Sequence, residues 1–150
     1  MQKMYKVILV DIDGTIADAS KRVHYLKGPK KNWDSFYEAC HLDDPIPEVI
    51  DLVKNLMSSY RVIFCTGRRE SERQKTWQWL KDHEIYITTC KLLMRKEGDY
   101  RPDHVCKPEL VKEAHIKNED IAFVLEDRDS MVKYWRDQGV RCLQVANGDF

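Results

Sequence analysis

The sequence lacks several features that would place it in whole classes of protein. Its five cysteines are scattered, odd in number and without a CxxC pair, which argues against a disulfide framework and against a zinc ribbon. We therefore expect reduced thiols and a cytoplasmic location. No apolar run approaches the length of a membrane span, and no signal peptide precedes the first apolar segment, so we expect no membrane partner.

An excess of one charge is also absent. The 25 lysines and arginines balance the 25 aspartates and glutamates, so any site for a polyanion must be a local patch and not a general basic field. The hydrophobic fraction of 43% is typical of a globular protein. Because the chain has 150 residues and shows no repeat, low-complexity segment or linker, we expect one domain over residues 1–150.

The most informative stretch is VILVDIDGT at residues 7–15, where an apolar run is followed by two aspartates. Four aliphatic residues in a row predict a strand buried on both faces. Asp11 and Asp13 follow it directly. Two bare carboxylates repel each other, so we expect a cation to share their site. The alternative is an ordinary turn after a strand, because Asp and Gly are common turn residues.

Short apolar segments then alternate with segments of helical periodicity. The expected strands are residues 5–10, 61–65, part of 85–94, 121–125 and 142–145. The expected helices begin near 43–47, cover 70–83, run from Pro108 to about His115, and pass through Met131, Val132 and Trp135 to end near Gly139. This alternation predicts an α/β fold, in which a central parallel sheet carries helices on both faces.

Chemically useful side chains follow several of these strands. The set comprises Asp11, Asp13, Thr66, Lys107, Glu126 and Asp127. In a parallel sheet the carboxyl ends of the strands border one crevice, so we expect these groups to converge. The acids suit a hard cation such as Mg²⁺, and a hydroxyl with an ammonium suits the oxygens of a phosphate. One carboxylate could attack phosphorus to form an aspartyl-phosphate, while the second exchanges protons with the leaving oxygen and with water.

These residues resemble a known family. Asp11-Ile-Asp13-Gly-Thr, Thr66, Lys107 and Glu126-Asp127 are similar, in order and spread, to the four motifs of the haloacid dehalogenase (HAD) superfamily of phosphohydrolases. The segments 65–68, 95–107, 127–128 and 135–150 further resemble the 3′-phosphatase domain of phage polynucleotide kinase/phosphatase. The sequence contains no GxxxxGK[ST] motif, so the resemblance implies only the phosphatase half. It also implies a three-layer Rossmann-like fold.

The resemblance assigns a role to each matching position. It implies that Asp11 is the nucleophile and Asp13 the general acid/base, with Mg²⁺ held by these two residues, Asp127 and Glu126. Thr66, Gly67, Arg68, Arg95 and Lys107 would bind the substrate phosphate, and Asp103 and Arg128 would support the site. Two residues depart from the phage pattern: Thr66 replaces a serine, and Glu126 replaces an aspartate. The second change leaves open which of Glu126 and Asp127 touches the metal directly.

Residues 16–45 match the phage pattern poorly and form at most a small cap after the first strand. Basic side chains at 21, 22, 27, 30 and 31 are interleaved there with aromatic ones at 24, 25, 33, 36 and 37. The segment is either a cap that binds phosphates and stacks on a base, or a solvated loop whose Trp33 and Phe36 pack on the body.

The expected function is a Mg²⁺-dependent phosphomonoesterase that acts through an aspartyl-phosphate. The favoured substrate is a nucleic-acid 3′-phosphate end in repair, with a separate polynucleotide kinase or ligase as a possible partner. The first alternative is a nucleotidase or small-metabolite phosphatase, because one fold serves many substrates. A binding module without activity and a phosphotransferase are the other two.

Overall fold

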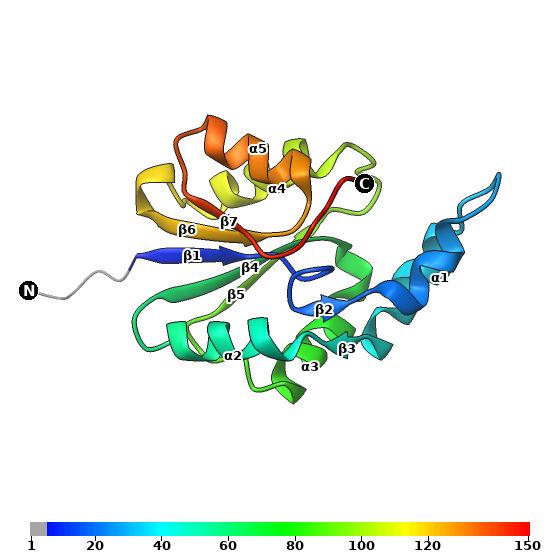
Figure 1. Cartoon of the computed structure of the whole chain (residues 1–150), viewed down its shortest axis with the longest axis horizontal. Helices are drawn as coiled ribbons and strands as arrows, with labels where there is room; N and C mark the ends of the chain where they lie inside the picture. The colour runs from blue at the N-terminus through cyan, green and yellow to red at the C-terminus, as the bar shows by residue number, and fades with distance from the viewer. Residues whose placement is uncertain (1–5) are drawn as a thin grey trace, which may run out of the picture.

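The computed structural model describes residues 6–150, and its centre is a five-stranded parallel sheet. The strands are β1 (Val7–Val10), β4 (Arg61–Arg69), β5 (Lys91–Arg95), β6 (Ile121–Glu126) and β7 (Cys142–Gln144), in the spatial order β5-β4-β1-β6-β7 (Figure 1). β1 is the middle strand, with β4 and β6 paired on its two sides. The predicted parallel sheet is confirmed, although residue 5 of the first expected strand lies outside the described residues.

Helices cover both faces of this sheet. On one face lie α2 (Pro47–Leu56) and α3 (Arg73–Asp82), and on the other lie α4 (Asp103–Glu113) and α5 (Asp129–Asp137) (Figure 1). Short 3₁₀ turns, η3 (Glu70–Glu72) and η4 (Asn118–Asp120), precede α3 and β6. The three-layer α/β arrangement expected from the sequence is therefore confirmed.

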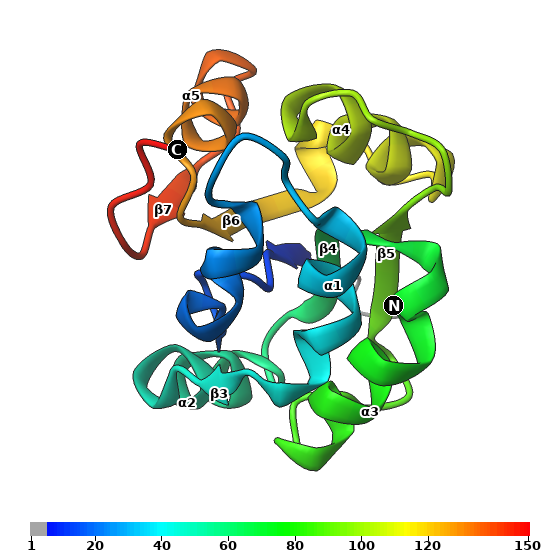
Figure 2. The same cartoon turned by 90° about the vertical axis from the view of Figure 1, so that its right-hand side faces the viewer.

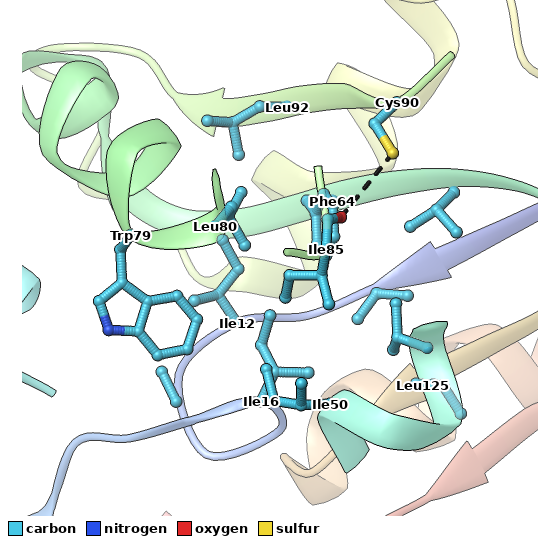
Figure 3. Close-up of a cluster of buried hydrophobic side chains, with 14 of the residues drawn as sticks. Ile12, Ile16, Ile50, Phe64, Trp79, Leu80, Ile85, Cys90, Leu92 and Leu125 are labelled. Atoms are coloured by element: carbon cyan, nitrogen blue, oxygen red, sulfur yellow. Dashed lines mark hydrogen bonds between the residues drawn. The ribbon is translucent and has the colours of Figure 1, made fainter. Parts of the chain in front are cut away.

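The core is divided between the two faces by the alternation of side chains along β1. Ile8 and Val10 point to the α2/α3 side, and Val7 and Leu9 point to the α4/α5 side. Figure 3 shows the first of these clusters, in which Phe64 of β4 packs with side chains of α2 and α3. A strand buried on both faces must be apolar throughout, which is why Val-Ile-Leu-Val occupies the centre.

Two boundaries differ from the prediction by four residues or more. The helix expected to start at Pro108 begins at Asp103, so Pro108 lies inside α4 and the expectation that it occupies the first turn is wrong. The acidic side chain of Asp103 suits the positive end of the helix, and Pro102 holds the extended conformation before it. Strand β4 continues to Arg69 with an irregularity after Thr66, so Thr66 lies within the strand and not after it.

An insert of about thirty residues follows β1. It contains β2 (Ala17–Asp18), η1 (Ser20–Leu26), α1 (Trp33–Glu38), η2 (Ala39–Leu42) and β3 (Asp44–Pro45). β2 and β3 pair as a small antiparallel ribbon, which closes the base of the insert. We call residues 17–45 the cap; Figure 2 looks onto the carboxyl ends of the sheet strands and shows the cap in front of them.

The cysteines and the helices of the structure bear on two expectations from the sequence, reduced thiols and no membrane span. All five cysteines are buried and unpaired. Among residues 6–150, none of the helices combines the length and the apolar character needed to cross a bilayer.

Candidate active site

A cavity of about 810 Å³ lies at the carboxyl ends of the strands, below the cap. Most of the predicted site residues form its wall: Asp11, Asp13, Thr66, Gly67, Arg95, Asp103, Glu126, Asp127 and Arg128. Lys107 and Arg68 are not on the wall. Both are buried directly behind it, in contact with Asp11 and Asp13 respectively.

A tight loop after β1 presents the two aspartates. The amides of Thr15, Ile16 and Ala17 all donate to the carbonyl of Ile12, which folds the chain back on itself. Gly14 has a φ of +81°, and a Cβ there would lie 2.0 Å from an oxygen of Asp127. Glycine is needed at this position because its backbone is left-handed and passes directly against a carboxylate.

Asp11, Lys107, Glu126 and Asp127 form what we call the acid–lysine cluster. The Lys107 ammonium donates to Asp11 Oδ1 at 2.8 Å and to Glu126 Oε2 at 3.0 Å. Asp11 Oδ2 also accepts a 2.9 Å bond from the hydroxyl of Thr15. Three carboxylates share one ammonium in a buried place, so the cluster carries an excess of negative charge.

The pKa values in this cluster reflect that excess. Burial and the neighbouring Glu126 raise the pKa of Asp11 to about 7, although Lys107 acts in the opposite direction. Burial and the charge of Asp11 likewise raise the pKa of Asp127 to about 7. Burial alone would lower the pKa of Lys107, but the surrounding carboxylates outweigh it and raise that pKa well above its ordinary value.

The donor chemistry of the cluster fits a hard divalent cation. Oxygen atoms of Asp11, Glu126 and Asp127 all lie within 4.8 Å of one another. Carboxylates that repel each other in a buried cavity are stabilised by a cation that takes oxygen ligands. Glu126 already accepts bonds from Lys107 and from the amides of residues 127 and 128. The carboxylate of Asp127 is therefore the better placed of these two for direct contact with a metal.

Asp13 belongs to a second group of charges, the arginine network of Asp13, Arg22, Asp43 and Arg68. Arg68 donates to Asp13 Oδ1 at 2.7 Å from its Nη2, and Arg22 donates to the same oxygen at 2.7 Å. Both guanidiniums also bond to Asp43 Oδ2, at 3.1 and 2.6 Å. Burial favours the neutral form of Asp13, but the two arginines outweigh it and lower its pKa.

Arg22 and Asp43 are not among the site residues predicted from the sequence. In sequence, Arg22 is one of the basic side chains of the cap and Asp43 precedes a helix, yet both side chains are almost fully buried. No periodicity marks them, because their partners are brought close only by the folding of the cap. The structure also places Arg68, expected to bind substrate, behind Asp13, where it contacts Thr76 as well.

The remaining predicted residues connect three elements: Arg95, at the end of β5, contacts both β4 and α4. Arg95 donates to the carbonyl of Gly67 at 3.0 Å and to the carboxylate of Asp103. Asp103 also lies 3.9 Å from both Lys107 and Arg128, so it connects three cations. Burial acts against ionisation of Asp103, but these cations lower its pKa. These contacts hold the part of β4 that carries Thr66, because Gly67 is the next residue.

The fold defines a class. A haloacid dehalogenase-like hydrolase of Streptococcus pneumoniae superimposes with a TM-score of 0.68 over 95% of this chain and 85% of its own, at 16% identity. At that identity the likeness concerns the fold alone, and it places the chain among the HAD-type α/β folds.

The family is narrower than the class. The profile of the polynucleotide kinase PNKP phosphatase domain matches residues 5–150, so the chain belongs to this family of domains. A chain of the Pnkp1/Rnl/Hen1 RNA repair complex superimposes with a TM-score of 0.83 at 29% identity, over 100% of this chain and 45% of its own. A protein of Autographa californica nuclear polyhedrosis virus, named as a putative bifunctional polynucleotide kinase/RNA ligase, is 27% identical over 90% of this chain. The chain spans 18% of that viral relative's length.

Proposed function

We propose that the protein is a Mg²⁺-dependent polynucleotide 3′-phosphatase that works through an aspartyl-phosphate on Asp11. The observation that supports it most is the pairing of two aspartates in opposite electrostatic settings at the floor of one cavity. The surroundings of Asp11 lack positive charge, which suits a nucleophile assisted by a metal. The surroundings of Asp13 are neutralised by two arginines, which suits a group that transfers protons.

Asp11 is the proposed nucleophile. It is buried at the cavity wall, and its two oxygens are oriented by Lys107 and Thr15, so little freedom remains to be lost before attack. The bond formed joins a carboxylate oxygen to phosphorus, and the bond broken is that between phosphorus and the leaving ester oxygen. Water then attacks phosphorus, releases inorganic phosphate and restores the carboxylate.

Asp13 is the proposed proton carrier of both steps. Its carboxyl is ionised at neutral pH because of the arginine network, so it can accept the proton of the attacking water. To serve the leaving oxygen in the first step, the carboxyl must first take up a proton, which it then gives up readily because its pKa is lowered; the water that attacks in the second step returns a proton to it. Arg22 and Arg68 are proposed to position this carboxyl rather than to contact substrate.

The phosphoryl oxygens are held by Thr66 and Lys107 in this proposal. The Thr66 hydroxyl oxygen accepts from the amide of Arg68 at 3.1 Å, which leaves its proton free to donate into the cavity. Lys107 uses two of its three N–H groups on Asp11 and Glu126, so one remains. Asp11, Asp127 and the Asp13 carbonyl would hold Mg²⁺, which when bound neutralises phosphate oxygens as the anionic nucleophile approaches.

The 3′-phosphate end is favoured by the family and by the nature of the cavity. The cavity is wide enough to admit more than a phosphate group, and it is bordered by aromatic as well as charged side chains. A nucleotidase with the same catalytic residues is the second candidate, since catalytic motifs do not determine the substrate.

The test is the release of phosphate in the presence of Mg²⁺ from a defined set of substrates. These are a 3′-phosphorylated oligonucleotide, its 5′-phosphorylated counterpart, 3′- and 5′-mononucleotides and an aryl phosphate. Selective release from the 3′ end is expected. Preference for mononucleotides would instead support the nucleotidase.

The matched blank is Asp11→Asn, which should reduce turnover by about 1,000-fold or more while the thermal melt stays cooperative. Acid quenching with radiolabelled substrate should trap label on the wild-type protein and none on Asp11→Asn. Near-full activity of Asp11→Asn would show that another group is the nucleophile.

A further inference from the structure

Exposed aromatic side chains gather around the mouth of the cavity. Within residues 6–150, three Trp, Tyr or Phe side chains are exposed: Trp33 at 45%, Tyr100 at 90% and Phe150 at 68%. All three line the cavity. They come from three different segments, namely α1 in the cap, the connection from β5 to α4, and the stretch after β7. We call them the aromatic rim.

The rim has no role in the catalytic steps described above. Trp33 is supported from below, because it packs edge-on against Phe36 at 5.8 Å and is stacked with Tyr37 at 5.9 Å between ring centroids. The Tyr37 hydroxyl in turn donates to the carbonyl of Gly67, next to Thr66. Leaving large aromatic faces in water is unfavourable, and such a group of apolar side chains usually marks a binding surface.

Positive charge accompanies the rim. The Lys31 ammonium lies 5.8 Å from the centre of the Trp33 ring, and the Arg128 guanidinium lies 4.9 Å from that of Phe150. In the described part of the chain, Lys27, Lys30 and Lys31 form no salt bridge. Aromatic faces beside cations are the combination that binds single-stranded nucleic acid, where bases stack on rings and phosphates meet cations.

We propose that the aromatic rim stacks the unpaired bases next to the terminal phosphate, so that the enzyme recognises the end of a single strand. This inference rests on the proposed function and adds to it where the bases bind. The rim borders the same cavity as Asp11, so a strand whose phosphate reaches Asp11 has its last bases at the rim. A base inside a duplex is stacked on its neighbours and cannot also stack on a side chain, hence the expected preference for single strands.

The experiment compares a single-stranded oligonucleotide bearing a 3′-phosphate with the same strand whose last two nucleotides are abasic. Trp33→Ala should raise KM for the intact strand about tenfold, leave kcat within about twofold, and leave KM for the abasic strand nearly unchanged. Tyr100→Ala should act in the same direction, and Trp33→Phe should recover most of the loss. Ile87→Ala removes an equally exposed side chain, at 45%, that does not line the cavity, and should change neither substrate.

Binding is measured separately from turnover, so that the two proposals can fail independently. The Asp11→Asn protein, with and without Trp33→Ala, is titrated with both strands, and the anisotropy of a label at the 5′ end is followed. If the wild type releases no phosphate from 3′ ends, the proposed function is wrong. The stacking inference is still supported in that case if Trp33→Ala weakens binding of the intact strand and not of the abasic strand. Equal effects of Trp33→Ala on intact and abasic strands, in KM and in binding, would overturn the stacking inference.

Discussion

The two aspartates of the loop after β1 lie two residues apart, yet they belong to charge clusters of opposite design. In the acid–lysine cluster, three carboxylates share the single ammonium of Lys107, and the pKa of Asp11 rises to about 7. In the arginine network, two carboxylates meet two guanidiniums, and the pKa of Asp13 falls. One cluster still lacks positive charge, whereas the other is neutralised by the protein itself.

The difference shows how one loop can supply two kinds of carboxylate. In the function proposed above, a cation from solution and the substrate phosphate complete the first cluster. The second is completed by the cap, because Arg22 and Asp43 both belong to it. The contacts that bind the cap to the body are therefore the same contacts that set the state of Asp13.

The largest loss of stability is expected when one charge is removed from the arginine network. Arg22→Met leaves Asp43 and Asp13 with one guanidinium between them, and loss of one partner of a buried pair costs roughly 3–5 kcal/mol of unfolding free energy. Asp43→Asn should cost a similar amount, and the double variant should cost much less than the sum of the two. Urea unfolding of the four proteins measures this. Additive losses would mean that the pair is not coupled.

Removing the ammonium from the acid–lysine cluster should chiefly affect catalysis. Lys107→Met deletes the group proposed to hold a phosphoryl oxygen and leaves three carboxylates uncompensated. We expect kcat/KM to fall by about 100- to 1,000-fold. Lys112→Met, an exposed lysine on the same helix, is the matched control and should behave as wild type. A loss below tenfold would exclude Lys107 from the phosphate site.

Metal addition should distinguish the two clusters directly. Mg²⁺ at about 100 times its Kd should stabilise the protein by about 2.7 kcal/mol, and EDTA should reverse the effect. Asp127→Asn should abolish most of this stabilisation, whereas Arg22→Met should lower the starting stability and keep the increment. The melting temperature with and without Mg²⁺, at constant ionic strength, provides the measurement. An undiminished increment in Asp127→Asn would place the metal elsewhere.

The smallest effect is expected from the surface of the cap. Replacing Lys27, Lys30 and Lys31 by Gln should raise KM for oligonucleotides and flatten its dependence on salt, by about 0.7 in logarithmic slope for each strand phosphate that no longer meets a lysine. Lys21 is left unchanged because it is paired with Asp44 at 2.6 Å.

The control for the cap lysines replaces three exposed lysines that lie outside the cap, Lys91, Lys112 and Lys117. A small aryl phosphate should be unaffected in both sets. The same salt slope in both triple variants would remove the cap lysines from the path of the strand.

Much of the fold could be predicted because the pattern of each element is local. The run Val7–Val10 predicts a strand buried on both faces, and the stripe that includes Ile50 and Val53 predicts a helix with one buried face. The rule that parallel strands present their carboxyl ends to one crevice then brings Asp11, Thr66 and Asp127 together. The sequence by itself therefore determined the α/β class and the members of the acid cluster.

Only the tertiary structure decided what neutralises Asp13 and where the exposed aromatics gather. Arg22 and Asp43 reach Asp13 and Arg68 across the fold of the cap, and in sequence they are an ordinary cap arginine and a residue before a helix. Trp33, Tyr100 and Phe150 likewise share one cavity mouth although they are 50 or more residues apart in the chain. Proximity of this kind follows from how the segments pack, and local periodicity does not predict packing between distant segments.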